Sequence, residues 1–372
     1  MKKRFLRDIA EIQTGPFGSQ LHKEDYVDVG TPIVTVEHLG CRVFSEQNLP
    51  MVSDTDKSRL SKYVLKKGDI VFSRVGSVDR CSFVDPKHDG WMFSGRCLRV
   101  RPSEEVDSLF LYYFFCLNTT KEFVRSIAVG ATMPSINTKL LGEVEVVCPE
   151  IEEQRKIADI LSKIDDKIEE NQKINENLQQ QAQAIFNNKY APSLCSPNWV
   201  VGTIGDVVTL QRGYDLPKDK MVSGSYPVAG STDTIFYHNE YTTEAPCVVM
   251  GRSGNIGKPR LYMERCWAHN TTLFVKDFKG NNPYWSYYML RSIDYSQFRG
   301  GSAVPTLNRN HVHSFEISIP PVSQQNEFAE IILPLLLLIE NNRKEIKRLS
   351  TLREALLPKL MAGELDVSSI DL

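Results

Sequence analysis

Two long segments of the chain place apolar residues three and four positions apart among polar ones, which is the pattern of one buried helix face. The first runs from Ile151 to Tyr190 without glycine or proline, and the second runs from Val322 to about Leu357. The spacing is close to that of a coiled coil, although the stripe of the first segment changes phase after Ile168. We therefore expect two long helices that pack against each other.

The expected contact between the helices uses the apolar stripe of each segment. Its positions are Ile157, Leu161, Ile164, Ile168, Asn171 and Leu178 in the first segment, and Phe328, Ile332, Leu335, Ile339, Asn342, Ile346 and Leu349 in the second. The two asparagines either fix the register of the pair, as a buried asparagine does in coiled coils, or face solvent at the end of the contact. Pro334 lacks a backbone donor, so it should kink the second helix or mark its true start.

A block of short β-type runs bounded by turn residues precedes each helix. After a short strand or turn (FLRDIAEIQTG or TIGDVVTLQRG), the runs are TPIVTV, GDIVFSRVG, CLRVRP and VEVVCP in the first block, and YPVAGS, APCVVMGRSG, TTLFVKD and FEISIP in the second. Each block also contains an apolar and aromatic segment that we expect to be a buried helix, with Asp107 or Asn282 as its capping residue. His311 and His313 should share one face of a strand, without a third ligand for a metal.

The sequence repeats once over half its length, although loops of different length interrupt the match. Pro134, Asn137, Pro149, Gln154 and Asn171 recur 171 positions later, and Arg74 and Gly76 recur 178 positions later. The repeat predicts an α+β protein with two pseudo-two-fold-related α/β domains joined by a long antiparallel two-helix coiled coil. The predicted parts are the domains at 1–148 and 199–319, a central helix at 149–190, a linker at 191–198, and a C-terminal helix and tail at 320–372.

The composition is that of an ordinary globular protein, with 41% hydrophobic and 24% charged residues. No apolar run is long enough to span a bilayer, no signal-peptide core follows the basic N-terminus, and the eight cysteines form no CxxC pair. These features indicate a cytoplasmic protein with reduced thiols and with neither metal nor cofactor. Lys and Arg number 20 against 19 Asp and Glu in residues 1–148, and 12 against 10 in residues 199–319, whereas the helices are acidic. By itself this asymmetry does not decide between a DNA-binding surface and an ordinary one.

Candidate ligands for nucleic acid lie in loops rich in glycine and small residues. GRSGNIGKP resembles a phosphate loop, but it lacks one glycine and the Ser or Thr of that motif, so we exclude an NTPase. Its cationic and amide side chains suit phosphates and base edges, and Arg74, Ser77 and Arg80 repeat the arrangement, although a solvated turn is the alternative. The MPSIN and VPTLN turns either approach a ligand closely or form a structural bend. The candidates are Gln13, Thr14, Ser19, Gln20, Lys23, Arg74, Ser77, Arg80, Arg96, Thr132, Ser135, Asn137, Gln211, Arg212, Tyr214, Ser231, Thr232, Arg252, Ser253, Asn255, Lys258, Arg260, Asn270, Thr271, Ser302, Thr306, Asn308 and Arg309.

No catalytic constellation stands out in the sequence. Asn282-Pro283-Tyr284 is close to the Asn-Pro-Pro-Tyr element of amino-methyltransferases, but one proline is missing and no glycine-rich site for a methyl donor accompanies it. We therefore expect a protein that is not itself an enzyme. A self-sufficient DNA methyltransferase or endonuclease, and a coiled-coil scaffold that binds other proteins, are the competing hypotheses.

Taken in order, the motifs resemble the DNA-specificity subunits of type I restriction-modification systems. The resemblance is carried by GDIVFSRVG, CVVMGRSGNIGKP, the MPSIN and VPTLN turns, CPEIEEQRKIADILSKIDDKIEENQKI and IENNRKEIKRLSTLREALLPKLMAGEL, and it covers essentially the whole chain. It implies two target-recognition domains, each of which reads one half of a bipartite, asymmetric site in double-stranded DNA. The recognition loops vary most within the family, so the base-reading residues do not transfer from it.

The resemblance also implies a role for the helices. They would set the gap between the half-sites and dock two methyltransferase subunits, with two motor-nuclease subunits as optional partners, and catalysis would belong to those partners. At ~1.5 Å per residue, roughly 35 helical residues span about 50 Å. The polar outer face of the first helix is the expected docking surface.

Overall fold

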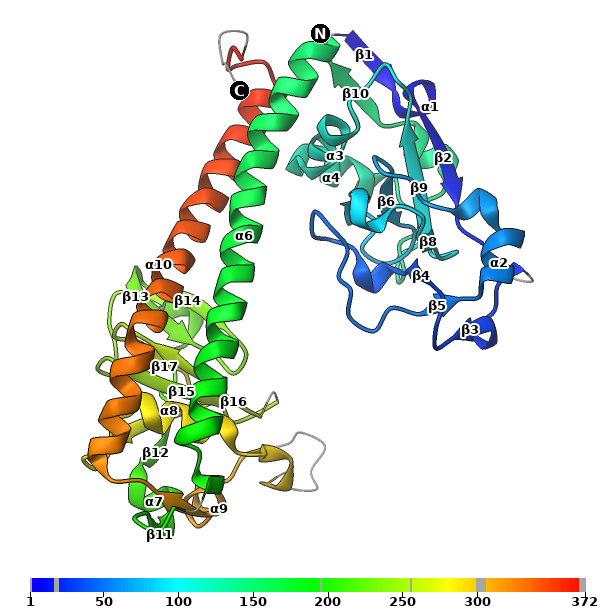
Figure 1. Cartoon of the computed structure of the whole chain (residues 1–372). Coiled ribbons are helices and arrows are strands. Elements are labelled where there is room, and N and C mark those ends of the chain that lie inside the picture. The colour runs from blue at the N-terminus through cyan, green and yellow to red at the C-terminus, as the bar shows by residue number, and fades with distance from the viewer. Residues whose placement is uncertain (1, 17–19, 195, 255, 299–305, 368–372) are drawn as a thin grey trace. The chain divides into compact units, whose positions relative to one another are not determined.

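The computed structural model describes residues 2–16, 20–194, 196–254, 256–298 and 306–367 (Figure 1). The chain divides into two compact units, and each is described by itself. Unit 1 comprises Met1–Glu169 and Lys347–Leu372, and unit 2 comprises Glu170–Ile346. Each unit therefore contains one block of strands together with a part of each long helix, and the α+β class expected from the sequence is confirmed.

Both long helices are present. Helix α6 spans Ile151–Lys189 and helix α10 spans Val322–Met361, with 39 and 40 residues. Helix α10 continues through Pro334, so the prediction that this proline could mark the start of the helix is wrong. A proline inside a helix costs about 3 kcal/mol. Burying a leucine or isoleucine side chain contributes roughly 1.5–3 kcal/mol, and Ile332 and Leu336 on either side of the proline are buried. Packing therefore outweighs the lost backbone hydrogen bond.

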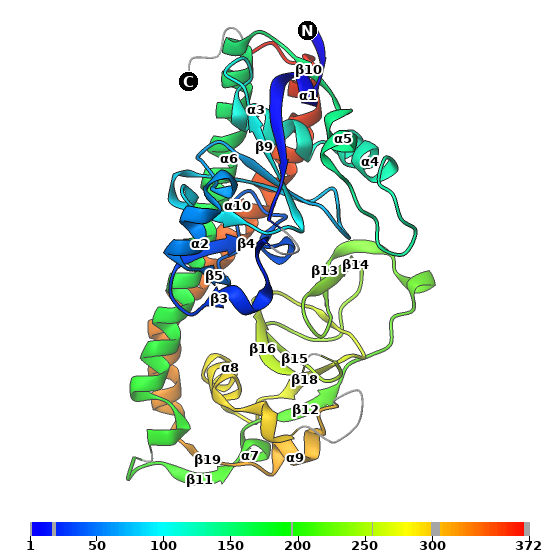
Figure 2. The ribbon, with the colours of Figure 1, turned by 90° about the vertical axis from the view of Figure 1, so that its right-hand side faces the viewer.

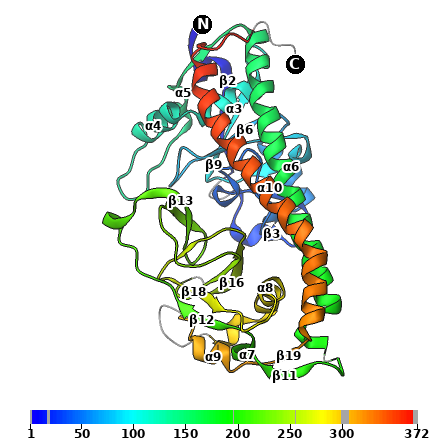
Figure 3. The same ribbon diagram turned by 90° about the vertical axis from the view of Figure 1, so that its left-hand side faces the viewer.

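The parts of α6 and α10 that belong to unit 2 run antiparallel (Figure 3). Asn342 Nδ2 donates to Asn175 Oδ1 at 3.0 Å, and Tyr190 Oη donates to Glu327 Oε1 at 2.9 Å. The partner number on α10 falls as the number on α6 rises, which fixes the opposite directions. The predicted antiparallel helix pair is confirmed.

Asn171 and Asn342 lie inside this helix contact. They are only 2% and 8% exposed, so the alternative in which they face solvent is wrong. Asn171 Nδ2 donates to Glu345 Oε2 at 3.0 Å, and Asn342 bonds to Asn175 as described above. Each asparagine therefore has a polar partner on the other helix, and a shift in register would leave buried amides without that partner.

Unit 1 is built on a four-stranded antiparallel sheet in the order β2-β9-β6-β7. A second sheet has the order β3-β5-β4-β8, and β1 pairs with β10. The strands are β1 Lys2–Phe5, β2 Ala10–Thr14, β3 Tyr26–Val27, β4 Thr31–Val34, β5 Met51–Val52, β6 Ile70–Ser73, β7 Cys81–Phe83, β8 Met92–Phe93, β9 Cys97–Pro102 and β10 Glu145–Cys148. The α-helices are α1 Leu6–Ile9, α2 Asp54–Arg59, α3 Ser108–Cys116, α4 Asn118–Ser126 and α5 Thr138–Gly142.

Unit 2 repeats this plan. Its four-stranded sheet has the order β12-β18-β15-β16, its second sheet the order β14-β13-β17, and β11 pairs with β19 (Figure 2). The strands are β11 Val200–Thr203, β12 Thr209–Arg212, β13 Ser223–Ala229, β14 Thr234–His238, β15 Cys247–Gly251, β16 Gly257–Tyr262, β17 Trp267–Ala268, β18 Thr272–Asp277 and β19 Glu316–Ile319. The α-helices before α10 are α7 Ile204–Val207, α8 Pro283–Ser292 and α9 Arg309–His313.

Strands β6 and β15, which lie inside the four-stranded sheets, are almost entirely apolar because both faces of each sheet are covered. In β6, Ile70 and Phe72 belong to the core formed with α3, whereas Val71 packs into the core beneath the second sheet. In β15, Val248 and Met250 belong to the core formed with α8, whereas Val249 packs on the other side. This two-residue alternation is that of a strand buried on both faces.

The two predicted buried helices are confirmed, and so are their caps. Asp107 Oδ1 accepts from the backbone N–H groups of Leu109 and Phe110 at the start of α3. Asn282 Oδ1 does the same for the N–H groups of Tyr284 and Trp285 at the start of α8.

The sequence misplaced two local features. His311 and His313 lie in helix α9 and not in a strand, because Asn308 caps the first turn through the N–H of Asn310 at 2.9 Å. The GRSGNIGKP segment is a loop only in part, since β16 begins at Gly257 and pairs with β15. None of the helices in the described ranges is long and apolar enough to cross a membrane.

Candidate nucleic-acid interface

One end of the four-stranded sheet gathers the loops that the sequence singled out. In unit 1, β2 ends at Thr14 and β6 at Ser73, whereas the antiparallel β7 and β9 begin at Cys81 and Cys97. Because neighbouring strands are antiparallel, the loops that follow β2 and β6 and the segments that precede β7 and β9 lie at the same end of the sheet. We call this end of the sheet the loop edge.

The loop edge of unit 2 has the same construction. Strands β12 and β15 end at Arg212 and Gly251, and β16 and β18 begin at Gly257 and Thr272. The connecting loops that contain Arg252, Ser253 and Thr271 therefore lie together, as those that contain Arg74, Ser77 and Arg96 do in unit 1.

Arg74 lies where three chain segments of unit 1 cross. Its backbone N–H donates to Arg96 O at 2.8 Å, and its carbonyl accepts from Ile136 N at 2.9 Å. An isolated bridge also joins Val75 to Ser135. The backbone thus joins the loop after β6, the turn before β9 and the MPSIN turn into one surface.

Arg252 has the matching position in unit 2. Its N–H donates to Thr271 O at 2.9 Å, its carbonyl accepts from Leu307 N at 2.8 Å, and Ser253 bridges Thr306. The same three hydrogen-bonding relationships therefore hold both arginine loops. The recurrence was the reason for choosing these loops from the sequence, and the structure shows that it extends to the backbone.

Glycine is required at the tip of each arginine loop. Gly76 has φ 74° and Gly254 has φ 78°, a left-handed conformation that residues with a Cβ adopt at a cost. A Cβ added at either position would have no neighbour within 4 Å among the described atoms. The glycines therefore serve the turn, and the space that a side chain would occupy at each of them is open.

Two other glycines allow close approach of the backbone. A Cβ at Gly15 would lie 2.2 Å from Ser94 O, and one at Gly213 would lie 2.1 Å from His269 O. Real Cβ atoms do not approach an oxygen so closely, so the chain after β2 or β12 rests directly on the turn before β9 or β18. This contact brings Gln13 and Gln211 to the loop edge of their units.

The candidate side chains differ in how far they reach solvent. The exposed ones are Ser77, Arg80, Arg96, Thr132, Asn137, Arg212, Tyr214, Thr232, Lys258, Thr306, Asn308 and Arg309. The half-buried ones are Gln13, Thr14, Gln20, Arg74, Ser135, Gln211, Ser231, Arg252, Ser253, Arg260, Asn270 and Thr271. Ser19, Asn255 and Ser302 lie outside the described residues, as does the side chain of Lys23.

Several candidate side chains form hydrogen bonds with the backbone of the chain itself. Asn137 Oδ1 accepts from Leu140 N at 2.9 Å and caps α5, and Asn308 caps α9 in the same way. These residues support the bend that was the structural alternative for the MPSIN and VPTLN turns. Arg80 donates to Leu39 O, and Arg260 donates to Gly230 O from strand β16 rather than from the loop.

The loop edge of unit 2 includes an exposed aromatic ring and a histidine. Tyr214 is 42% exposed, and its Oη accepts from Gln211 Nε2 at 2.9 Å. Burial lowers the pKa of His269, although Asp215 opposes this shift. His269 Nδ1 lies 3.2 Å from Thr271 Oγ1. A neutral imidazole, a hydroxyl and a phenol together offer hydrogen bonds of both senses to base edges.

Sequence reasoning missed an apolar tip beside the loop edge of unit 1. Val129 and Met133 are 63% and 67% exposed, and they lie on a short hairpin in which Val129 pairs with Ser135. The position of Met133 between Gly130 and Pro134 was the available signal, because glycine and proline bound a tight turn. Such a tip can contact thymine methyl groups or sugar rings.

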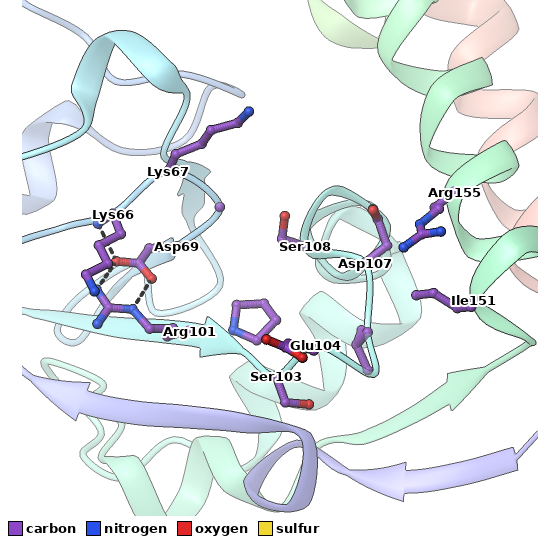
Figure 4. A pocket seen from close by; sticks show the side chains of 13 residues that line it. Lys66, Lys67, Asp69, Arg101, Ser103, Glu104, Asp107, Ser108, Ile151 and Arg155 are labelled. Atoms are coloured by element: carbon purple, nitrogen blue, oxygen red, sulfur yellow. Dashed lines mark hydrogen bonds and ion pairs between the residues drawn. The ribbon is translucent and has the colours of Figure 1, made fainter.

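A separate cavity of about 350 Å³ lies in unit 1 at the opposite end of the strands (Figure 4). Lys66, Asp69 and Arg101 line one side, and Arg155 lies on the other. Asp69 already binds Arg101 through both carboxylate oxygens at 2.7 Å, so these two charges compensate each other. Because the cavity is remote from the loop edge, it takes no part in the candidate interface. No group of three or more metal-ligating side chains occurs among the described residues.

Comparisons with known proteins agree with this architecture. Residues 1–180 and 197–351 match the family described as type I restriction modification DNA specificity domain. The chain is 27% identical over 319 residues to the type I restriction enzyme MjaIX specificity subunit of Methanocaldococcus jannaschii, covering 73% of this chain and 72% of that protein. It is 31% identical over 158 residues to the HindI specificity subunit of Haemophilus influenzae, covering 41% and 33% of the two chains.

One solved structure shares the fold over nearly the whole length. The crystal structure of a type I restriction-modification S subunit from M. genitalium aligns with a TM-score of 0.63 at 17% identity. The alignment covers 96% of this chain and 95% of that one. At this level of identity the likeness concerns the fold.

Proposed function

Because this chain belongs to the type I restriction-modification DNA specificity domain family, we propose that it is the DNA-reading subunit of a type I restriction-modification complex. In this role it is not an enzyme, since methyl transfer and cleavage belong to partner subunits. A complex that modifies host DNA must have access to that DNA, so we propose that this chain is located in the cytoplasm. The observation that carries the proposal is the duplicated loop edge, in which Arg74 and Arg252 are held by equivalent backbone hydrogen bonds.

Each loop edge is proposed to read one half of a bipartite site, with residues 1–148 and 199–319 as the two recognition domains. Arginine binds guanine bidentately and phosphate strongly, and the neighbouring hydroxyl and amide side chains suit the remaining base edges. The two loop edges carry different side chains around the shared frame, such as Arg96 in place of Thr271. Different side chains on the same frame would read different sequences, which makes the site asymmetric.

The helices are proposed to dock two methyltransferase subunits, with two motor-nuclease subunits added in a restriction complex. Ile331 and Leu338 of α10 are 40% and 45% exposed, and Pro334 between them is also exposed. Residues spaced by three and four positions share one helix face. This apolar stripe of α10 is a better docking candidate than the polar face of α6 that the sequence favoured, because burying apolar side chains drives association.

Sequencing of methylated bases in a host that expresses this chain with its methyltransferase subunit tests the proposal. We expect one bipartite motif with a fixed gap. Replacing residues 1–148 by the corresponding block of a relative should change one half of the motif. A change in both halves, or in neither, contradicts the proposal of two independent reading domains.

A purified chain, incubated with DNA and a labelled methyl donor without partners, separates the competing functions. No transfer is expected, and any transfer would identify a self-sufficient methyltransferase. DNA binding that stays unspecific even with the methyltransferase present would favour a protein-interaction scaffold. Leu338→Glu should release the methyltransferase in size-exclusion chromatography, whereas Glu330→Gln on the same helix should not.

A further inference from the structure

In unit 1, Arg42 connects the domain formed by the strands to helix α6. Arg42 Nε donates to Glu169 Oε1 at 2.8 Å, Arg42 Nη2 binds the Asp166 carboxylate, and Arg42 Nη1 donates to Ser162 O at 3.4 Å. The Arg42 side chain is only 15% exposed. One guanidinium therefore holds two turns of the helix through its planar fork, a geometry that fixes orientation as well as distance.

The loop that presents Arg42 is itself anchored on the four-stranded sheet. Arg42 O accepts from Phe83 N at 2.7 Å, and Ser82 Oγ donates to Cys41 O at 2.7 Å. Both Ser82 and Phe83 belong to β7, the edge strand of that sheet. Two residues further on, Phe44 is buried against His88, with ring centroids 5.2 Å apart. Arg42 thus acts from a fixed base on the sheet.

A second polar link lies one residue before Asp166. Tyr113 Oη of α3 donates to Asp165 Oδ2 at 2.8 Å, and Arg353 Nη1 of α10 donates to Asp165 Oδ1 at 2.7 Å. Asp165 is 4% exposed, so these hydrogen bonds are shielded from water. Burial opposes the charge of Arg42, but its bonds to Glu169 and Asp166 raise the pKa of Arg42 overall. The contact between the first recognition domain and α6 in unit 1 therefore includes charged and directional interactions.

The repeat places different chemistry at the same positions of unit 2. Leu336, Leu337 and Glu340 of α10 stand where Asp165, Asp166 and Glu169 stand on α6. Tyr288, the counterpart of Tyr113, packs its ring against Phe186 and Phe328 at centroid distances of 5.8 and 5.3 Å. An apolar contact of this kind is non-directional and tolerates small shifts better than paired charges do.

We propose that Arg42 is a positioning residue that fixes the orientation of the first recognition domain on α6, and thereby the gap between half-sites that the complex accepts. The inference rests on the proposed function, because a gap exists only for a reader of a bipartite site. In this role Arg42 itself contacts no base. Its loss would leave both half-site sequences intact and would relax only the distance between them.

The test compares methylated motifs of complexes assembled with variant chains. For Arg42→Ala we expect the ratio of methylation at sites with a gap one base pair too long or too short, relative to the wild-type gap, to rise about tenfold, which is about 1.4 kcal/mol of discrimination. Arg42→Lys keeps the charge without the fork and should lie between wild type and alanine. Lys87→Ala is the matched control, because Lys87 binds Glu46 of the same loop at 2.6 Å without touching α6.

The outcomes separate this inference from the proposed function. If the wild-type complex gives no bipartite motif, the proposed function fails. If the wild-type gap is fixed and Arg42→Ala keeps the same gap selectivity, only the positioning role of Arg42 is overturned. Should Arg42→Ala lose all methylation, the double variant Asp166→Asn and Glu169→Gln decides, since it leaves the recognition domain unaltered and must show the same relaxed gap.

Discussion

At the scale of residues, the duplication is clearest in two buried glutamines. Gln154 Oε1 accepts from Asp107 N at 2.9 Å, and Gln154 Nε2 donates to Pro149 O at 2.9 Å. Gln325 Oε1 accepts from the N–H of the next helix cap, Asn282, at 2.8 Å, and Gln325 Nε2 donates to Pro320 O at 3.0 Å. Each glutamine therefore joins the start of the buried helix to the start of a long helix.

Replacement of Gln154 by leucine should destabilise unit 1. The glutamine is 1% exposed, so the change leaves the backbone N–H of Asp107 and the carbonyl of Pro149 buried without partners. Each such group costs about 1–3 kcal/mol, so we expect the free energy of unfolding to fall by roughly 2–6 kcal/mol, seen as a lower urea midpoint. Gln180→Leu on the exposed face of α6 is the control and should change stability by less than about 0.5 kcal/mol. Equal effects of the two changes would refute the role of Gln154.

Acid should weaken unit 2 through His313. Burial is the main cause that lowers the pKa of His313, and Lys279 and Arg309 lower it further. The neutral ring accepts from Leu210 N at 2.9 Å, and a protonated ring cannot. Because the folded pKa lies below the unfolded value of about 6.5, the stability is complete above that pH and is lost as the pH falls through the folded pKa. His313→Gln should lose less stability between pH 7.5 and 5.5 than wild type in urea unfolding, whereas exposed His22→Gln should behave like wild type.

At the scale of elements, the eight runs predicted as strands are all present because their apolar residues are continuous or alternate. The sequence pattern did not predict the short edge strands. Strand β16 contains Pro259 and begins with a glycine, which the edge of a sheet tolerates although a central strand would not. Strand β1 has the polar sequence KKRF, which shows no strand pattern. It forms by pairing with β10, some 140 residues away in the chain. Such long-range pairing leaves no local pattern.

The residues of the loop edge could be predicted where the sequence motif occurs in both domains, and they could not be predicted where it does not. Arg74 and Arg252 were found because an Arg-x-Gly element occurs twice after an apolar strand. The capping roles of Asn137 and Asn308 were not separable from base contact, since an asparagine side chain serves both and the choice depends on whether a helix follows. The exposed Met133 was missed because an isolated apolar residue in a turn has no periodic partner.

Arg74→Ala should relax or abolish recognition in one half-site, and Arg252→Ala in the other. A good bidentate arginine contact contributes about 1–3 kcal/mol of discrimination, so methylation at the affected half-site should fall about tenfold or spread to another base. Sequencing of methylated DNA measures both results. Asn137→Ala provides the contrast, because loss of a cap costs about 1 kcal/mol of stability and should leave the motif unchanged. Identical motifs for all three variants would show that the arginine loops do not read bases.

At the scale of the whole molecule, the repeat gives the two recognition domains and the helix segments beside them the same construction. A chain in which residues 199–319 are replaced by a second copy of residues 1–148 should therefore recognise an inverted repeat of the first half-site. In that chain the second copy of Arg42 would face Leu337 and Glu340 of α10 rather than Asp166 and Glu169. One carboxylate of the pair is then missing, so the motif should be methylated at more than one gap length, and Leu337→Asp should narrow the gaps by restoring it. Sequencing of methylated DNA measures both the half-site sequences and the gap lengths. An asymmetric motif would show that the domains do not read independently, and a single gap without Leu337→Asp would show that the charged contact does not set the spacing.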